Sequence, residues 1–72
     1  MNNKNKDKIF KLIRKFLNGE FTFGEDTAIA KDISDLLGFK GKSEEILDIM
    51  SESLINNDND DTVYGNLLKI KR

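Results

Sequence analysis

The side chains in this chain that could do chemistry are nearly all carboxylates and amines. None of the 72 residues is Cys or His, so a thiol nucleophile, the usual general base and the common zinc ligands are missing. Acids are dense between Glu44 and Asp61, and there Glu44, Asp48 and Glu52 recur at intervals of four residues. These residue types argue against hydrolytic and metal-dependent enzymes. We therefore expect no enzymatic activity, no metal and no cofactor.

The run NNDNDD, residues 56–61, is the segment that could suggest a calcium loop. An EF-hand loop needs Gly at its sixth position and Glu at its twelfth. Counting from Asn56 places Asp61 and Leu67 at these positions instead. Calcium binding is therefore not expected, and the run is predicted to be a polar loop.

Charge is distributed unevenly along the chain. Residues 1–19 carry a net charge of +5, residues 20–62 carry −9 and residues 63–72 carry +3, although the whole chain carries only −1. Such segregation can be neutralised inside the fold, or it can leave an acidic face for a basic partner.

Apolar residues recur at the spacing of a helix, and the chain contains no Pro. We predict an all-α fold, a compact bundle of three to four helices. Residues 7–72 are predicted to form one helical domain, and residues 1–6 a disordered basic arm.

Residues that start and stop helices divide this domain into segments. The predicted helices, with the residues expected to cap or end them, are 7–18 with Asp7 and Gly19, 27–37 with Asp26 and Gly38, and 43–55 with Ser43. The predicted core-facing side chains of these helices are Ile9, Ile13, Phe16, Ile29, Ile33, Leu36, Leu37, Ile46, Leu47, Ile49, Met50 and Leu54.

The segment after residue 61 has two interpretations. Apolar residues between Val63 and Leu68 have helical spacing, which favours a short fourth helix. Gly65 weakens a helix by about 1 kcal/mol relative to Ala, so a strand is the competing prediction. The strand gives the alternative fold, a winged helix-turn-helix with a C-terminal β-hairpin.

The stretch ISDLLGF, residues 33–39, resembles the first helix and turn of helix-turn-helix proteins such as phage repressors and winged-helix regulators. Ser34 departs from the pattern, since a small apolar residue is usual there, and the turn is about two residues longer than in the strict motif. The resemblance implies that residues 43–55 form a recognition helix and residues 54–71 a wing.

Charge argues against DNA binding by the 43–55 helix. Its outward arc carries Glu44, Glu45, Asp48 and Glu52 without a cation. Affinity for DNA comes largely from Lys and Arg placed near phosphates, so this arc would repel a duplex. A small phage or mobile-element DNA-binding regulator, in contact through the basic arm or the wing, is therefore the second interpretation.

The same acids have two interpretations as a protein surface. Charged runs commonly form a solvated face that only keeps a protein soluble. Here Glu44, Asp48 and Glu52 line up without a Lys in their helix, and like charges at this spacing cost about 0.2–0.5 kcal/mol per pair. A cationic partner would relieve that cost, which favours a binding surface.

The stretches IRKFLNGEFT and EEILDIMSESLINNDNDDTVYGNLLKI, with the helix pair between them, resemble small acidic all-helical bacterial toxin-immunity proteins of the colicin-D-like, Maf-type and contact-dependent inhibition kinds. The likeness lies in helix lengths, an acidic loop and scattered apolar positions. It implies an immunity or inhibitor protein that occludes a basic, nuclease-like toxin. The partner-binding residues would be Glu44, Glu45, Asp48, Glu52, Asp58, Asp60 and Asp61.

The N-terminal MNNKNKDK has no hydrophobic region behind its charges, and the apolar runs are short. A signal peptide and a membrane span are therefore not expected. We expect a cytoplasmic bacterial protein whose partner is a basic protein, with nucleic acid a less favoured partner and no membrane contact.

Overall fold

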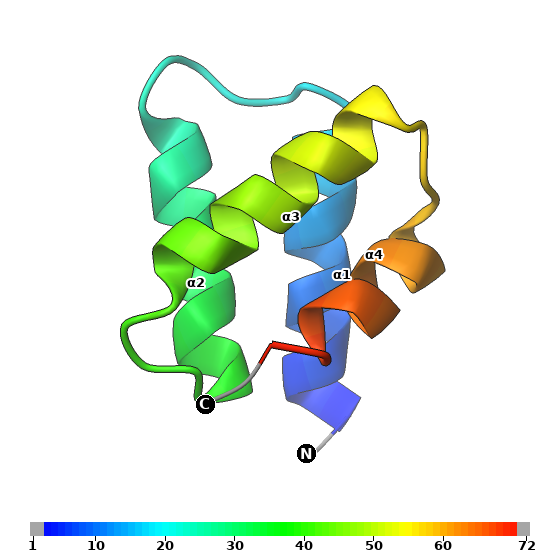
Figure 1. The fold of residues 1–72 in the computed structure, drawn as a ribbon. Helices are drawn as coiled ribbons and strands as arrows, with labels where there is room; N and C mark the ends of the chain where they lie inside the picture. The colour runs from blue at the N-terminus through cyan, green and yellow to red at the C-terminus, as the bar shows by residue number, and fades with distance from the viewer. Residues whose placement is uncertain (1–2, 71–72) are drawn as a thin grey trace.

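Four helices pack around one core in the computed structural model, which describes residues 3–70 (Figure 1). The helices are α1 (Asn3–Leu17), α2 (Glu25–Leu37), α3 (Ser43–Ile55) and α4 (Asp60–Leu67). α1 and α2 run antiparallel, α3 crosses both of them diagonally, and α4 packs against α1 and α3. The described residues contain no strand, so the predicted all-α bundle is confirmed.

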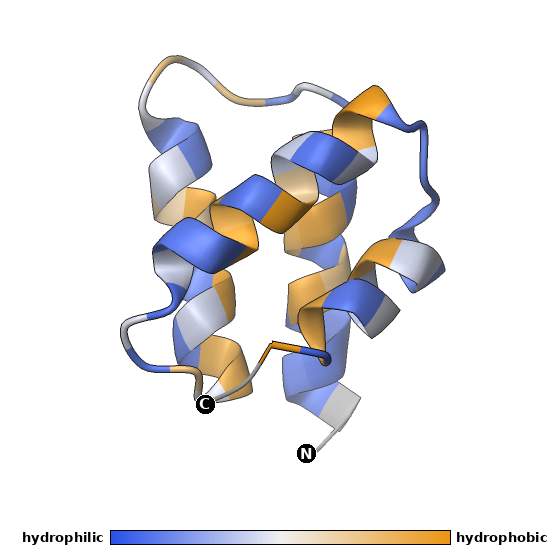
Figure 2. Cartoon of the chain, in the orientation of Figure 1, coloured by the Kyte–Doolittle hydropathy of each residue, from blue (hydrophilic) through white to orange (hydrophobic). Residues whose placement is uncertain are grey.

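The core takes apolar side chains from the inner side of every helix, as the hydropathy colouring shows (Figure 2). The buried apolar residues are Ile9, Ile13, Phe16, Ile29, Ala30, Ile33, Leu37, Phe39, Ile46, Met50, Val63 and Leu67. Full burial of an aliphatic side chain of this size contributes about 1.5–3 kcal/mol. The helices are thus held by their shared core, with α3 spanning the other three.

Only some of the α3 residues that were predicted to face the core are buried. Ile46 and Met50 are fully buried, whereas Leu47 and Ile49 are half-buried at the edges of the contact. Leu54 is 40% exposed, so its assignment to the core was wrong. α3 crosses its neighbours at an angle, and its last turn extends beyond them (Figure 1).

α1 begins at Asn3 and not at the predicted Asp7. Residues 3–6, predicted to belong to a disordered arm, are helical, and residues 1 and 2 lie outside the described residues. The Lys6 ammonium lies 5.9 Å from the ring centre of Phe10 and 5.7 Å from that of Tyr64 on α4. This cation–π contact gives the first turn a tertiary partner that sequence periodicity does not show.

Left-handed glycines follow the first two helices, as predicted. Gly19 has a φ of 69° and Gly38 a φ of 74°. The Glu20 amide donates to the Lys15 carbonyl at 3.0 Å across Gly19, which closes the end of α1. Both helix ends are therefore set by residues that tolerate a positive φ.

The turn after α2 is held by a pair of hydrogen bonds between Ser34 and Phe39. The Phe39 amide donates to the Ser34 carbonyl at 3.0 Å, and the Ser34 hydroxyl donates to the Phe39 carbonyl at 2.5 Å. Ser34 is only 3% exposed, and its buried hydroxyl has its hydrogen-bond partner in the Phe39 carbonyl. Ser34, which departs from the helix-turn-helix pattern, therefore stabilises the turn that follows α2.

The helix N-termini differ from the predictions. Asp7 lies within α1, and Asp26 lies within α2 behind the N-cap Gly24. Ser43 is the first residue of α3 and follows the N-cap Lys42, without a side-chain cap hydrogen bond. Cap prediction fails here because several polar residues stand before each helix, and the path of the entering loop selects among them.

The C-terminal segment settles the choice between helix and strand. α4 covers residues 60–67, with Val63 and Leu67 fully buried. The alternative fold with a C-terminal β-hairpin is therefore wrong for the described residues, and the predicted polar loop ends at Asn59. Among these residues no helix is both long and apolar enough to cross a membrane.

Candidate protein-docking surface

The outer side of α3 carries a line of exposed side chains that we call the α3 outer stripe. It consists of Glu44, Asp48, Glu52 and Ile55, all exposed. At about 100° per residue these four positions fall within an arc of about 80°. The stripe points away from the buried Ile46 side of the same helix.

The three carboxylates of the stripe form no ion pair or hydrogen bond with any described side chain. Two cations near the end of α1 have other neighbours. Lys15 lies 3.9 Å from Glu25 on α2, and Arg14 lies over the Phe10 ring. The basic first helix therefore does not neutralise the stripe within residues 3–70.

Ile55 is the member of the stripe that sequence reasoning missed as a functional residue. Its side chain is 81% exposed, in line with Glu44 along the helix. An exposed aliphatic side chain offers apolar area whose removal from water favours association with a partner that covers it. No local pattern marked Ile55 out, because neighbouring residues of a helix can both be buried, as Ile29 and Ala30 are in α2.

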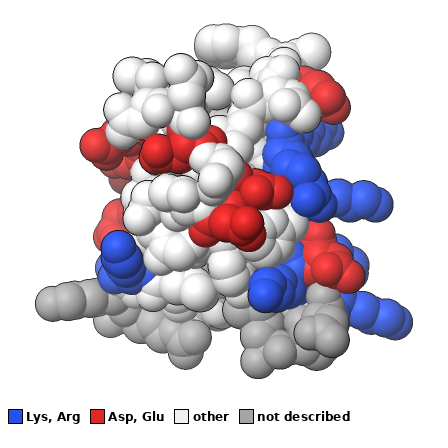
Figure 3. Space-filling view, turned by 90° about the vertical axis from the view of Figure 1, so that its right-hand side faces the viewer, with Lys and Arg blue, Asp and Glu red and all other residues white. Residues whose placement is uncertain are grey.

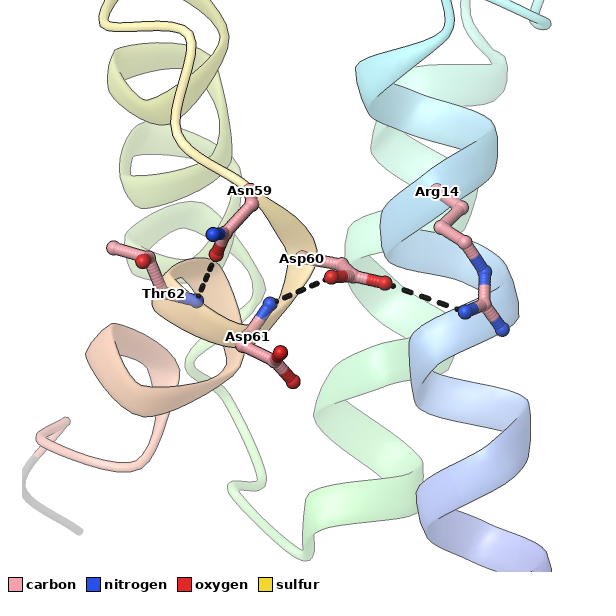
Figure 4. A network of polar contacts seen from close by, with 5 residues as sticks. All are labelled: Arg14, Asn59, Asp60, Asp61 and Thr62. Atoms are coloured by element: carbon pink, nitrogen blue, oxygen red, sulfur yellow. Dashed lines mark hydrogen bonds and ion pairs between the residues drawn. The ribbon is translucent and has the colours of Figure 1, made fainter.

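Asp60 was predicted to bind the same partner as the acids of α3, but its carboxylate takes part in the contacts between α4 and α1 (Figure 4). Its Oδ2 lies 3.3 Å from Arg14 Nη1 on α1, and its Oδ1 accepts from the Asp61 amide at 2.9 Å. The Asn59 side chain accepts from the Thr62 amide at 2.8 Å and caps α4. These polar residues anchor α4, so Asp60 is not available to a partner as a free carboxylate.

The other predicted binding residues are divided between the stripe and its surroundings. Glu45 accepts a hydrogen bond from Lys42 at 3.2 Å within its own helix end. Asp58 is half-buried and shares with Glu52 a polar hollow of about 220 Å³ between α3 and α4. Asp61 is exposed on α4, in the first turn. The seven acids therefore do not form one surface.

The space-filling view of the α4 side shows how the charges are arranged (Figure 3). Acidic groups lie at the left edge, at the centre and on the right of this face, and most basic side chains lie toward the right among the acids there. The upper end, where α3 ends in Figure 1, is largely uncharged. Exposed Leu54 and Ile55 belong to that end of α3.

Glu25, unlike the stripe acids, has hydrogen-bond donors and a cation beside its carboxylate. The Thr22 hydroxyl and the Thr22 amide both donate to it, and Lys15 adds its charge. The Thr22 hydroxyl, ahead of the amide and Lys15, lowers the pKa of Glu25 below its ordinary value. The stripe carboxylates have no comparable donors among the described residues.

Within residues 3–70 there is no group of three or more His, Cys, Asp or Glu side chains placed to hold a metal ion. The stripe itself presents carboxylates and one exposed aliphatic side chain. Comparison with protein families, with curated proteins and with solved structures found no match to this chain. The resemblance to toxin-immunity proteins stays a prediction.

Proposed function

We propose that this chain is a non-enzymatic protein-binding domain that docks a basic protein on the α3 outer stripe. The observation that carries the proposal is one exposed isoleucine on the same helix face as three carboxylates that have no ion pair or hydrogen bond within residues 3–70. Carboxylates alone would suit a solvated surface. An 81% exposed Ile55 in the same line adds apolar area that a partner would remove from water.

The two kinds of side chain would do different work in such a complex. The carboxylates attract a cationic partner and raise the rate of association. Ile55 loses its contact with water only when the complex forms, so it lowers the rate of dissociation. The rest of α3 is held rigidly by the buried Ile46 and Met50, so binding needs little ordering of this helix.

The specific form of the proposal is an immunity or inhibitor protein that occludes a basic toxin of nuclease type. It is supported by the sequence resemblance and by the spacing of the stripe, where negative groups follow one another as phosphates do along a nucleic acid. Glu44, Asp48 and Glu52 would then occupy the cationic groove of the toxin.

The test begins with the chain as bait for proteins of its native host. The protein that stays bound is purified, and its association with the chain is measured by stopped flow at several salt concentrations. We expect the association rate to fall steeply with salt, and the doubly reversed variant Asp48→Lys with Glu52→Lys to slow association by about tenfold or more.

The matched control reverses two exposed acids elsewhere, Asp7→Lys with Glu20→Lys, and changes the net charge by the same amount. Equal slowing by both double variants would show that net charge alone matters and would contradict a specific stripe. Ile55→Ala should speed dissociation by about tenfold, whereas Leu68→Ala, at a second exposed aliphatic residue, should not. Unchanged dissociation for Ile55→Ala would remove the anchor from the proposal.

A gel-shift experiment with nonspecific duplex DNA at low salt separates this function from a DNA-binding regulator. We expect no shift, since the exposed face of α3 is acidic and the wing that a winged helix needs is replaced by α4. A shift that disappears on raising the salt would favour the regulator.

A further inference from the structure

A second surface lies on the outer side of the α1–α2 pair, where neither α3 nor α4 takes part. It is an open groove of about 410 Å³ between the two antiparallel helices. The lining residues are Lys8, Lys11 and Leu12 of α1, and Asp32, Asp35 and Leu36 of α2. None of them belongs to the α3 outer stripe, so this groove is independent of the proposed function.

The groove has an apolar floor and two rims of opposite charge. Leu12 and Leu36 are half-buried and leave part of their apolar surface open. The α1 rim is cationic and the α2 rim anionic, and all four charged side chains are exposed. At the other end of the same helix pair, Lys15 and Glu25 do approach each other, to 3.9 Å.

Across the groove, by contrast, no ion pair joins the two rims within residues 3–70. The opposite charges stand on either side of the leucine floor without closing over it. An occupant of the groove must therefore meet a positive edge and a negative edge at the same time. A purely anionic or purely cationic ligand would be attracted by one rim and repelled by the other.

We infer that the groove receives a second copy of this chain, in a symmetric dimer whose two-fold axis runs parallel to α1 and α2. Such an axis brings α1 of each copy opposite α2 of its partner at the same height. The cationic rim of each copy then faces the anionic rim of the other, and the two leucine floors face each other across the axis. The interface is then a bundle of four helices, in which the α1–α2 pair of one copy faces the pair of the other.

The charge pattern favours a copy over an unrelated protein. A two-fold interface is formed by one patch with itself, so a patch must carry both signs of charge, placed across the axis from each other. The groove carries both signs, Lys8 and Lys11 on one rim and Asp32 and Asp35 on the other. Ala28, exposed one turn before Asp32 on the same side of α2, is small enough to let a neighbouring helix come close.

Charge reversal tests this geometry without disturbing the core, because Lys8, Lys11, Asp32 and Asp35 are exposed. Sedimentation equilibrium of the 72-residue chain from micromolar to millimolar concentration should show a monomer–dimer equilibrium. The variant Lys8→Glu with Lys11→Glu should raise the dimer dissociation constant by about tenfold or more, and so should Asp32→Lys with Asp35→Lys.

The decisive measurement mixes these two variants. In the mixture every reversed rim faces a rim of opposite sign, so a heterodimer should form as tightly as the parent dimer, and the fourfold variant should dimerise again by itself. Circular dichroism checks that each variant keeps its helices, and Glu20→Lys with Asp61→Lys, at two exposed acids that do not line the groove, serves as a control with unchanged dimerisation.

Two results would overturn the inference. A chain that stays monomeric at every concentration would leave the groove to a different protein. If neither pair of charge reversals changes the dimer dissociation constant, the interface lies on another face. The same holds if mixing the two variants does not restore dimer formation. Neither result bears on the α3 outer stripe, since partner binding there is measured with different variants.

Discussion

Asp60 at the start of α4 and the stripe acids of α3 lie in similarly acidic stretches of the sequence and have opposite surroundings in the fold. Asp60 has a guanidinium 3.3 Å away and an amide on its other oxygen, and Asn59 beside it caps the helix. Glu44, Asp48 and Glu52 have no such partners among the described residues. Acids of the first kind stabilise this fold, whereas acids of the second kind are available to something outside it.

The largest expected difference in the free energy of unfolding is between substitutions on the two sides of α3. Ile46→Ala removes a side chain that is fully buried between helices, so it should lower the free energy of unfolding by about 2–5 kcal/mol. Asp48→Ala on the opposite side should change it by less than about 0.5 kcal/mol. Urea unfolding followed by circular dichroism measures both. A large loss from Asp48→Ala would show that the stripe has a structural role.

Removal of the α4 cap should have the next largest effect. Asn59→Ala leaves the Thr62 amide without its acceptor and should cost about 1 kcal/mol of stability. Asn56→Ala is the matched control, because Asn56 is exposed at the end of α3 and contributes to that turn through its backbone. Thermal unfolding of the two variants gives the comparison, and equal losses would mean that the side chain of Asn59 is not the cap in solution.

A double-mutant cycle between Arg14 and Asp60 sharpens the comparison at the level of one ion pair. The Arg14 side chain is 55% exposed, so solvent screens the pair and a coupling energy of about 0.2–1 kcal/mol is expected. The same cycle between Arg14 and Asp48 should give no coupling. Coupling that is larger for Asp48 than for Asp60 would contradict the arrangement of α1, α3 and α4 described above.

Reversal of one stripe charge should stabilise the isolated chain slightly. Asp48→Lys turns two like-charge contacts, with Glu44 and with Glu52, into attractive ones, so the free energy of unfolding should rise by about 0.5 kcal/mol. The same substitution should weaken partner binding. Stability gained where binding is lost would show that the stripe is retained for a partner, and a loss of stability would favour a structural purpose.

The smallest effect concerns Glu25, the carboxylate with donors of its own. Its pKa is lowered on folding, first by the Thr22 hydroxyl, so its contribution to stability is fully present above the ordinary value of 4.5. The contribution is lost as the pH falls through the lowered folded value. Thr22→Ala should move the Glu25 pKa back upward in an NMR titration, and an unchanged pKa would mean that Thr22 is not its main donor.

Much of the fold was accessible from local sequence features. The extent of α3, residues 43–55, and the left-handed glycines at 19 and 38 followed from periodicity and from the backbone freedom of Gly. Asn57 ends α3 with a φ of 58° in the same way, and Asn is the residue that most often substitutes for Gly there. Helix starts were less accessible, because Asp26 and Ser43 are acceptable caps that the loops did not use.

The candidate site was accessible only in part. The recurrence of Glu44, Asp48 and Glu52 at intervals of four residues predicted one exposed line, and the structure has these residues exposed on one side of α3. Asp60 was assigned to the same surface because it is near them in the sequence. Its actual partner, Arg14, is 46 residues away, and no local pattern indicates that α4 packs against that part of α1.

The sequence by itself determined that this chain is helical and where most of its helices end, because helix propensity, periodicity and left-handed turns depend on residues within one or two turns of each other. The tertiary structure alone decided which carboxylates are neutralised, that Leu54 and Ile55 remain outside the core, and that two rims of opposite charge face each other across the α1–α2 groove. These features depend on the angle at which helices cross, and that angle is set by how all the buried side chains fit together.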